Sequence, residues 1–405
     1  MNILYIAHRI PYPPNKGDKI RSFNEIKHLS SSHKVDLVCL TDNIDDLKFK
    51  SNLKKYCRRV FVQHFKINQA KLRGSINLVR GKAISVGYFY MRNIQKIIDQ
   101  WLSDTVYDAI ICFSSPMAEY VLNQSTNQPV NQSTTTIMDF CDVDSDKWLQ
   151  YSQRSKFPLN LIYRIENKRL LEYEKKINRS FDSSVFVSQQ EANLFYRLFP
   201  EAKNISVIGN GVDHEYFSQP ATRNPQPETL MFAGAMDYWA NVDGVLWFCE
   251  KILPIIRAGY PKLQFYIVGN NPNPKIQKLG SNKRINVTGF VEDIRPYYNN
   301  ADICVIPLRI ARGVQNKVLE AMSMGKAVIA TSVAVQSIRA TPGVHLLVED
   351  NFDKFAEAVS MLLKNHTLRN YLGTNARQFV KSNYNWQKNM KKFDELMEQA
   401  EAGRL

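Results

Sequence analysis

One segment in the last third of the chain combines residue types that could hold a phosphorylated ligand. It begins as a basic loop that contains Gly313, and it continues as a predicted helix in which Lys317 and Glu320 lie one turn apart. A cation near a helix start suits a diphosphate, and a carboxylate accepts two hydrogen bonds from a ribose diol. An ordinary helical ion pair would have the same spacing. From these residues alone, both interpretations stay open.

Four turns of glycine or polar residues follow predicted strands in the same half of the chain. They contain Gly234, Gly269, Gly289 and the loop 309–313. Small residues let backbone N–H groups approach a phosphate closely, and the N-terminus of a following helix adds a favourable dipole. One glycine after a strand is more often simply a turn residue. Four of them in one half-sheet favour a ligand-binding edge.

Polar residues near strand ends in the first half could serve a second substrate. Asp139, Asp142 and Asp144 cluster after a predicted strand, and one of them could deprotonate a hydroxyl group, although aspartates there also cap helices. We prefer Asp142. His8 follows the first strand and could point into a cleft, but a lone histidine is more often structural.

The elements that must position these residues alternate between strand and helix in two rounds, which predicts parallel sheets covered on both faces. The Pro-, Thr- and Asn-rich stretch 219–228 is the predicted linker, and 123–134 is a polar surface insertion. Strands are predicted at 2–7, 35–40, 107–113, 135–140, 184–188, from 205, and at 229–233, 264–268, 285–288, 303–307 and 327–330. Helices are predicted at 20–30, 159–173, 189–199, 242–256, 316–324 and 385–402.

Length and composition exclude several classes of protein. At about 150 residues per domain, the 405 residues form two or three domains, and 44% hydrophobic with 22% charged residues is typical of a globular chain. The six cysteines are scattered without metal-ligand or disulfide spacing, so we expect no metal site and a reducing compartment. No apolar run approaches the roughly 18 residues of a transmembrane helix, and no signal peptide is evident.

The net charge of +15 is unevenly distributed. Residues 47–98 contain thirteen Lys and Arg, no Asp or Glu, and several interleaved aromatic residues. This composition is typical of a surface that meets anionic lipid headgroups. A nucleic-acid-binding surface would be similar, and a solvated basic face without a partner is also open.

The segment 309–330 resembles the signature of the large retaining glycosyltransferase family 4, whose members have the GT-B fold, and 208–213 with Phe217 resembles that family's interdomain strand and turn. The resemblance covers nearly the whole chain. Three segments, 140–148, 235–243 and 311–322, are similar to a subgroup of sugar transferases associated with exosortase-A and exopolysaccharide gene clusters. The family resemblance implies two Rossmann-like doubly wound domains, 1–216 and 217–384, that face each other across a cleft. It also implies that the terminal helix 385–405 packs back on the first domain.

The resemblance implies that the second domain binds a nucleotide-sugar donor. Glu320 matches the second Glu of the family's E-x7-E motif and is expected to hold the ribose, whereas the first Glu position is Arg312 here. The Arg that the family commonly places after the first glycine is Ala235. Lys317 and Arg312 are therefore the expected diphosphate ligands and catalytic cations, with Arg309 behind them. The other implied donor-binding residues are Gly234, Gly269, Gly289, Gly313 and the base-walling Phe290 and Val291.

On the first domain, Gly17, Asp18, Lys19 and Arg21 match a family loop that closes over donor phosphate and acceptor, although a surface turn is an equal alternative. Asp142 is the expected acceptor-side catalytic residue. In the expected reaction the leaving diphosphate takes the acceptor's proton, so no metal and no other cofactor is needed.

The predicted function is retaining glycosyl transfer from a nucleotide-sugar donor to a glycan acceptor that is expected to be lipid-linked, in exopolysaccharide or cell-surface polysaccharide biosynthesis. The protein is expected to be cytoplasmic and peripheral on the inner face of the cytoplasmic membrane, to use residues 47–98 against anionic lipid, and to bind no nucleic acid. Two alternatives stay open: a GT-B nucleotide-sugar epimerase, and a non-enzymatic basic protein that binds nucleic acid.

Overall fold

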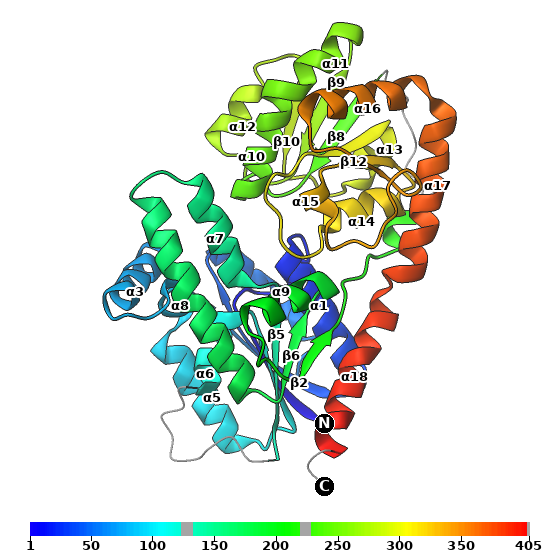
Figure 1. The fold of residues 1–405 in the computed structure, drawn as a ribbon. Helices are drawn as coiled ribbons and strands as arrows, with labels where there is room; N and C mark the ends of the chain where they lie inside the picture. The colour runs from blue at the N-terminus through cyan, green and yellow to red at the C-terminus, as the bar shows by residue number, and fades with distance from the viewer. Residues whose placement is uncertain (123–132, 219–227, 403–405) are drawn as a thin grey trace. The chain divides into compact units, whose positions relative to one another are not determined.

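The computed structural model describes residues 1–122, 133–218 and 228–402, and it divides into two compact units (Figure 1). The first contains 1–209 and 387–405, and the second contains 210–386. The sequence places the boundary at 216/217. The structure assigns 210–216 to the second unit, because the Val212 backbone N–H donates to the Tyr384 carbonyl and Val212 packs in the second core. The predicted insertion and linker lie almost entirely outside the described residues.

The first unit contains a seven-stranded, fully parallel sheet in the order β3-β2-β1-β4-β5-β6-β7. Its central strands are almost entirely buried and mostly apolar, as expected for a parallel sheet between helices. The strands are β1 (Asn2–Ala7), β2 (Lys34–Thr41), β3 (Arg59–His64), β4 (Ala109–Phe113), β5 (Thr135–Cys141), β6 (Ser183–Phe186) and β7 (Ile205–Val207).

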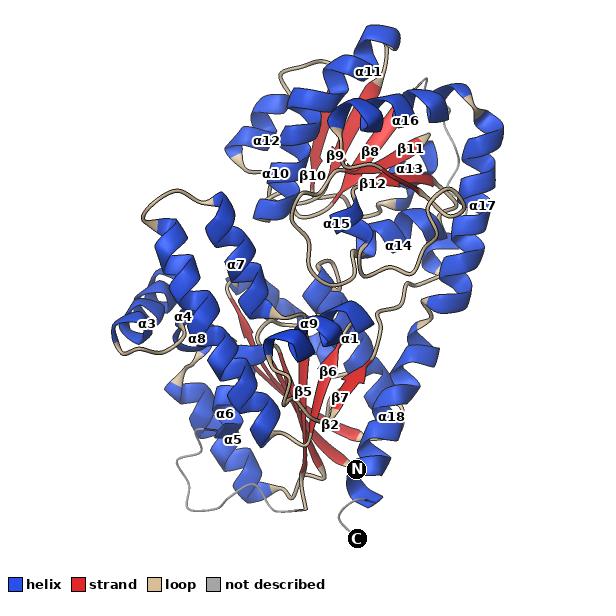
Figure 2. Ribbon diagram, in the orientation of Figure 1, coloured by secondary structure: helices blue, strands red, loops and turns tan. Residues whose placement is uncertain are grey.

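Helices cover both faces of this sheet (Figure 2). The longest, α8, packs on α7 and on α4, and the C-terminal helix α18 belongs to this unit from Gln387 onward. The helices are α1 (Gly17–Leu29), α2 (Lys50–Leu53), α3 (Ile67–Val79), α4 (Ile84–Phe89), α5 (Arg92–Asp104), α6 (Glu119–Leu122), α7 (Asp144–Arg154), α8 (Leu159–Ser180), α9 (Gln189–Leu198) and α18 (Trp386–Ala402), with 3-10 turns at Ile44–Phe49 and Ser115–Ala118.

The second unit contains a six-stranded parallel sheet in the order β10-β9-β8-β11-β12-β13. Its strands are β8 (Thr229–Ala233), β9 (Gln264–Val268), β10 (Ile285–Gly289), β11 (Ile303–Ile306), β12 (Ala327–Ala330) and β13 (Leu347–Val348). Its helices are α10 (Trp239–Trp247), α11 (Leu253–Gly259), α12 (Pro274–Leu279), α13 (Arg295–Asn300), α14 (Asn316–Ser323), α15 (Ser332–Val335), α16 (Phe352–Lys364) and α17 (His366–Asn383), with a 3-10 turn at Tyr216–Ser218.

The predicted α/β class, with two Rossmann-like domains, is confirmed by the two parallel sheets and their alternating helices. Some elements differ from the prediction. The single helix expected at 242–256 is α10 and α11 joined by a π-helical turn, Phe248–Ile252, because Pro254 lacks the N–H that an uninterrupted α-helix would use. No strand was predicted at β3, whose basic residues obscure the short apolar pattern. No helix in the described part of the chain is long and apolar enough to cross a membrane.

Candidate functional site

The candidate ligand-binding turns of the second unit lie along one edge of its sheet. Strands β10, β9, β8 and β11 are consecutive neighbours and parallel, so their carboxyl ends share that edge. Gly289, Gly269 and Gly234 end or follow three of these strands, and the loop 309–313 follows the fourth. The structure thus brings together four turns that are separated by as many as 79 residues in the sequence (234 to 313).

Two of these turns approach each other so closely that only glycine fits. A β-carbon on Gly269 would lie 1.8 Å from the carbonyl oxygen of Gly234, and the φ angle of Gly269 is +149°. A β-carbon on Gly234 would lie 2.7 Å from Asn241 Nδ2 and 3.2 Å from Lys317 Nζ. No side chain therefore covers the backbone of these two glycine turns beside the Lys317 ammonium group, which is what the close approach of a phosphate requires.

Lys317, in the first turn of α14, is held by neutral partners. Its Nζ donates a hydrogen bond to Asn241 Oδ1 and lies 4.7 Å from the centre of the Phe232 ring. Asn241 in turn donates from Nδ2 to the Ala235 carbonyl, 2.8 Å away, which fixes its orientation. Burial lowers the pKa of Lys317 to about 7, an effect that Glu320 only partly opposes.

Glu320 lies one turn further along α14 and is oriented by a core tyrosine. The Tyr298 hydroxyl donates to Glu320 Oε2 at 2.9 Å, and burial raises the pKa of Glu320 although Tyr298 and Lys317 oppose the shift. Within the described residues, no carboxylate oxygen lies within 4.0 Å of Lys317 Nζ. The helical ion pair that would have explained the spacing of Lys317 and Glu320 is therefore not formed.

The two arginines before α14 have different surroundings. The Arg309 guanidinium forms a bidentate ion pair with Asp243, with Nε donating at 2.9 Å, and stacks near Trp247. Its charge is thus already matched by a carboxylate. Arg312 is half-buried, and its carbonyl accepts from Gln315 Nε2 at 2.8 Å. Next to it, Gly313 has a φ of +59°, which lets the chain turn into α14.

The residues expected to wall a nucleobase lie at the end of β10. Gly289 has a φ of +69° with open space around it, Phe290 is 66% exposed, and Val291 packs against the core of the second unit. An exposed phenylalanine beside an open turn offers a ring face for stacking.

Sequence reasoning missed three residues of this site. Asn241, Tyr298 and Phe232 each contact Lys317 or Glu320. Asn241 lies in the segment 235–243 that carries the family resemblance, so a signal existed for it. Tyr298 and Phe232 are ordinary apolar core positions in the sequence, and only the packing of their helix and strand reveals the contact.

In the first unit, the structure places Arg21 of the predicted loop and Asp139 of the predicted aspartate cluster together in a buried network. Gly17 to Arg21 form the first turns of α1, and Arg21 is 0% exposed. Its Nε and Nη2 donate to Asp139 Oδ2 at 2.9 and 2.6 Å, and it also pairs with Glu25. Arg21 and Asp139 therefore neutralise each other in the core, where neither can reach a ligand.

The remaining members of that predicted loop are also paired. Lys19 is 5% exposed and its Nζ lies 3.0 Å from Asp46 Oδ2. Asp18 accepts from Arg9, and His8 Nε2 lies 3.2 Å from it. Although burial alone would raise the pKa of Asp18, the neighbouring Arg9 and His8 lower it below its usual value. The basic side chains at the start of α1, Lys19 and Arg21, are therefore already paired with carboxylates and are not free to bind a ligand.

Asp142 has the properties of a candidate proton acceptor. It follows β5 directly after Cys141, whose φ of +61° turns the chain sharply, and its Oδ1 is buried without a hydrogen-bond partner. Burial, with Asp144 nearby, raises the pKa of Asp142 to about 6. His8 Nδ1 is also buried without a partner, and the ring stacks 5.8 Å from Phe113 at the end of the neighbouring strand β4.

Comparison with known proteins gives one family model and several distant relatives. Residues 227–365 match the model described as "Glycosyl transferases group 1". An uncharacterized 44.6 kDa protein in a cps region of Klebsiella pneumoniae is 24% identical over 398 residues, which cover 95% of this chain and 97% of that protein. An uncharacterized glycosyltransferase of Methanocaldococcus jannaschii is 24% identical over 251 residues, or 58% of this chain and 63% of that protein.

Solved structures share the fold over the full chain. Sucrose-phosphate synthase from Thermosynechococcus elongatus has a TM-score of 0.75 at 16% identity and covers 100% of both chains. HepE from Anabaena, crystallised with UDP and glucose, has a TM-score of 0.68 at 15% identity and covers 98% of this chain and 100% of its own.

Proposed function

We propose that this chain, a glycosyltransferase of the group 1 type with the GT-B fold, transfers a sugar with retention from a nucleotide-sugar donor to a lipid-linked glycan acceptor. The role we propose is exopolysaccharide or cell-surface polysaccharide biosynthesis. The similarity to a protein from a cps region and to HepE, crystallised with UDP and glucose, supports this proposal. The epimerase and nucleic-acid-binding alternatives are not favoured by these similarities.

The observation that carries the proposal is the position of Lys317 Nζ. It lies beside the turn of Gly234, which the turn of Gly269 approaches closely, and it has neutral partners and no carboxylate within 4.0 Å among the described residues. A cation in a desolvated setting without a counter-ion is well placed to stabilise the charge that develops on a leaving diphosphate. Glu320, oriented by Tyr298, is the proposed acceptor of hydrogen bonds from the ribose diol.

In the proposed reaction the bond between the anomeric carbon and the phosphate oxygen breaks while the acceptor oxygen bonds to the same face of the sugar. The acceptor's proton passes to the leaving diphosphate. Lys317 and Arg312 stabilise the diphosphate, and the role proposed for Asp142 is to bind the acceptor hydroxyl. We propose no metal or other cofactor, and we expect transfer to continue in EDTA.

A screen of UDP-, GDP- and ADP-sugars tests the donor site. A ligand at a hundred times its dissociation constant stabilises the fold by about 2.7 kcal/mol, which is readily seen as a rise in melting temperature. We expect one nucleotide class to stabilise the wild-type protein and to stabilise Lys317→Ala much less. Release of free sugar or epimer without acceptor would favour the epimerase. A protein that no nucleotide sugar stabilises would contradict the proposal.

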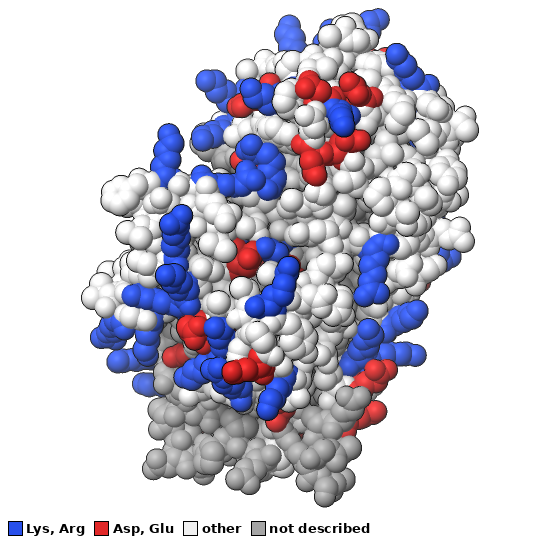
Figure 3. All heavy atoms as spheres, in the orientation of Figure 1, with Lys and Arg blue, Asp and Glu red and all other residues white. Residues whose placement is uncertain are grey.

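A lipid-linked acceptor would lie at a membrane surface, and the first unit has a surface that could bind a membrane. Helix α3 presents its large apolar residues outward. Leu72, Ile76 and Val79, at spacing i, i+4 and i+7, are 64%, 42% and 89% exposed, whereas the small residues Ala70 and Gly74 are buried. Figure 3 shows Lys and Arg side chains outnumbering Asp and Glu over the visible face of the first unit. Exposed apolar residues among basic ones suit the interface of an anionic membrane. We propose peripheral binding there, on the cytoplasmic side.

A further inference from the structure

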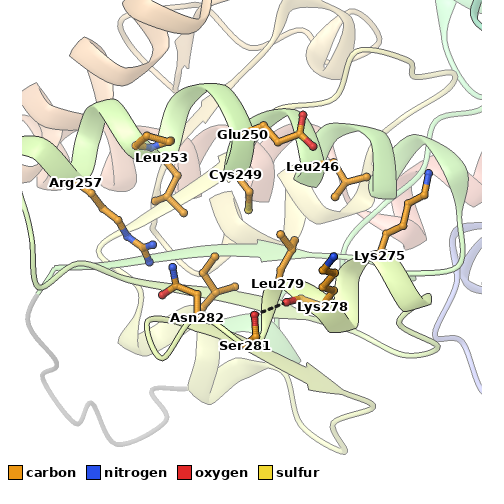
Figure 4. Close-up of a pocket in the computed structure, with 12 residues that line it drawn as sticks. Leu246, Cys249, Glu250, Leu253, Arg257, Lys275, Lys278, Leu279, Ser281 and Asn282 are labelled. Carbon is orange, nitrogen blue, oxygen red and sulfur yellow. Dashed lines mark hydrogen bonds between the residues drawn. The ribbon is translucent and has the colours of Figure 1, made fainter.

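A groove in the second unit lies away from the candidate donor site. It has a volume of about 730 Å³ and runs between the helices α10 and α11 on one side and α12 with the start of β10 on the other (Figure 4). Ile285, the first residue of β10, lines it, whereas the candidate donor site lies at the opposite, carboxyl end of that strand. The groove is therefore separate from the machinery proposed for sugar transfer.

The lining of the groove is apolar between basic ends. Leu246, Cys249, Leu253, Leu279 and Ile285 line it. Figure 4 shows Arg257 at one end of the labelled set, and Lys275 and Lys278 toward the other. Glu250 is the one acidic lining residue in the part of the chain that the structure describes. Burial raises the pKa of the Cys249 thiol to about 12, so this cysteine contributes an apolar surface rather than a nucleophile.

Arg257, which lines the groove, and the adjacent Arg284 have no carboxylate partner. Arg257 Nη2 donates to the carbonyl of Arg284 at 3.0 Å. Arg257 Nε and Arg284 Nη1 are excluded from solvent and make no hydrogen bond. Within residues 1–122, 133–218 and 228–402, no acidic oxygen lies within 4.0 Å of either guanidinium. A buried donor without a partner destabilises the free protein, so the surroundings of these two guanidinium groups favour an anionic ligand.

We propose that this groove binds a phosphate monoester with an apolar body, its phosphate against Arg257 and its apolar part along Leu246, Leu253 and Leu279. Arginine pairs with phosphate through parallel N–H bonds, which a lone lysine cannot form. The groove is larger than inorganic phosphate, and its apolar lining would leave such a small anion without contacts along most of its length. The ligand is either a soluble metabolite or the headgroup and adjoining chain of a membrane lipid.

Calorimetric titration of the full-length protein tests this site with three probes: inorganic phosphate, octyl phosphate and octyl glucoside. Octyl phosphate is expected to bind at least tenfold more tightly than the other two. Arg257→Gln is expected to weaken its binding at least tenfold, and Arg284→Gln serves as a second variant if the first fails to fold. The matched control is Lys251→Gln, an exposed residue of the neighbouring helical turn that does not line the groove.

The outcomes separate this site from the donor site. Lys317→Ala is expected to leave octyl phosphate binding unchanged. Equal binding of octyl phosphate and octyl glucoside, or loss of binding in Lys317→Ala, would overturn the proposal, as would wild-type affinity in both arginine variants. Vesicles containing phosphatidic acid then identify the source of the ligand. Binding that depends on Arg257 assigns a lipid, and binding of the soluble ester alone assigns a metabolite.

Discussion

The buried positive charge of Lys317 lowers the stability of the ligand-free protein. Its ammonium group has an amide and a ring face as neighbours instead of a carboxylate. Such a position is typical of a functional group that is stabilised only when its ligand arrives. We expect Lys317→Ala to lower kcat about 10²- to 10³-fold, the usual loss for one preorganised donor, with no loss of melting temperature.

Transfer assays and thermal melts check this expectation for Lys317. The control is Lys354→Ala, which removes an exposed lysine from the first turn of α16 and is expected to leave both measurements unchanged. A Lys317→Ala enzyme with wild-type turnover would remove the residue from the mechanism.

The lowered pKa of Lys317 predicts how donor binding depends on pH. Because protonated Lys317 binds the diphosphate and its pKa is about 7, affinity for a nucleotide sugar should be constant well below pH 7 and fall by up to about tenfold per pH unit above it. The diphosphate of such a donor is esterified at both ends and does not titrate in this range. Lys317→Arg should remove the dependence, since arginine stays protonated. Titration calorimetry across pH 6 to 9 provides the measurement.

The lowered pKa of Lys317 also makes the free energy of unfolding depend on pH. The unfolded chain binds the Lys317 proton more tightly than the folded chain, so the contribution of this residue to the free energy of unfolding rises with pH between about 7 and 10.5. Below about pH 7 both states are protonated, and the cost of the buried charge is fully present. Lys317→Met should therefore stabilise the free protein most at pH 6.

Glu320 provides a test of ribose recognition. The Tyr298 hydroxyl holds one carboxylate oxygen and leaves the other available to a ligand. Wild-type enzyme should prefer a ribonucleotide donor over its 2′-deoxy analogue, and Glu320→Ala should lose most of that preference, which corresponds to about 1.5–3 kcal/mol for a hydrogen bond to a charged group. Ratios of kcat/KM for the two donors measure it. Equal discrimination by both enzymes would exclude Glu320 from the ribose site.

At the scale of elements, the close approach of β8 and β9 depends on their terminal glycines. Gly269→Ala places a β-carbon 1.8 Å from the Gly234 carbonyl oxygen at an unfavourable φ of +149°. We expect it to destabilise the protein by several kcal/mol or to displace both turns and abolish donor binding. Gly259→Ala, at the end of α11 with open space around it, is the matched control and should be neutral or slightly stabilising. Urea unfolding of both variants measures the difference.

At the scale of the whole molecule, the net charge of +15 and the outward face of α3 predict membrane binding. Co-sedimentation with vesicles rich in phosphatidylglycerol should exceed that with neutral vesicles and weaken with salt, because exposed charges are screened. Ile76→Glu should reduce it severalfold. Met361→Glu is the matched control, since Met361 is 45% exposed but lies on α16 of the second unit. Equal loss in both variants would mean that α3 has no special role.

The sequence by itself determined the alternation of strands and helices, because buried parallel strands such as β8 and β9 are short, mostly apolar runs that are followed directly by glycine. It also placed Lys317 and Glu320 one turn apart, since helical spacing is a local property. Only the tertiary structure decided that Arg21 lies in a core network while Lys317 lies beside bare backbone without a carboxylate. The reason is that charge pairing and desolvation depend on partners more than 70 residues away, Asp139 for Arg21 and Asn241 for Lys317, which only folding brings within reach.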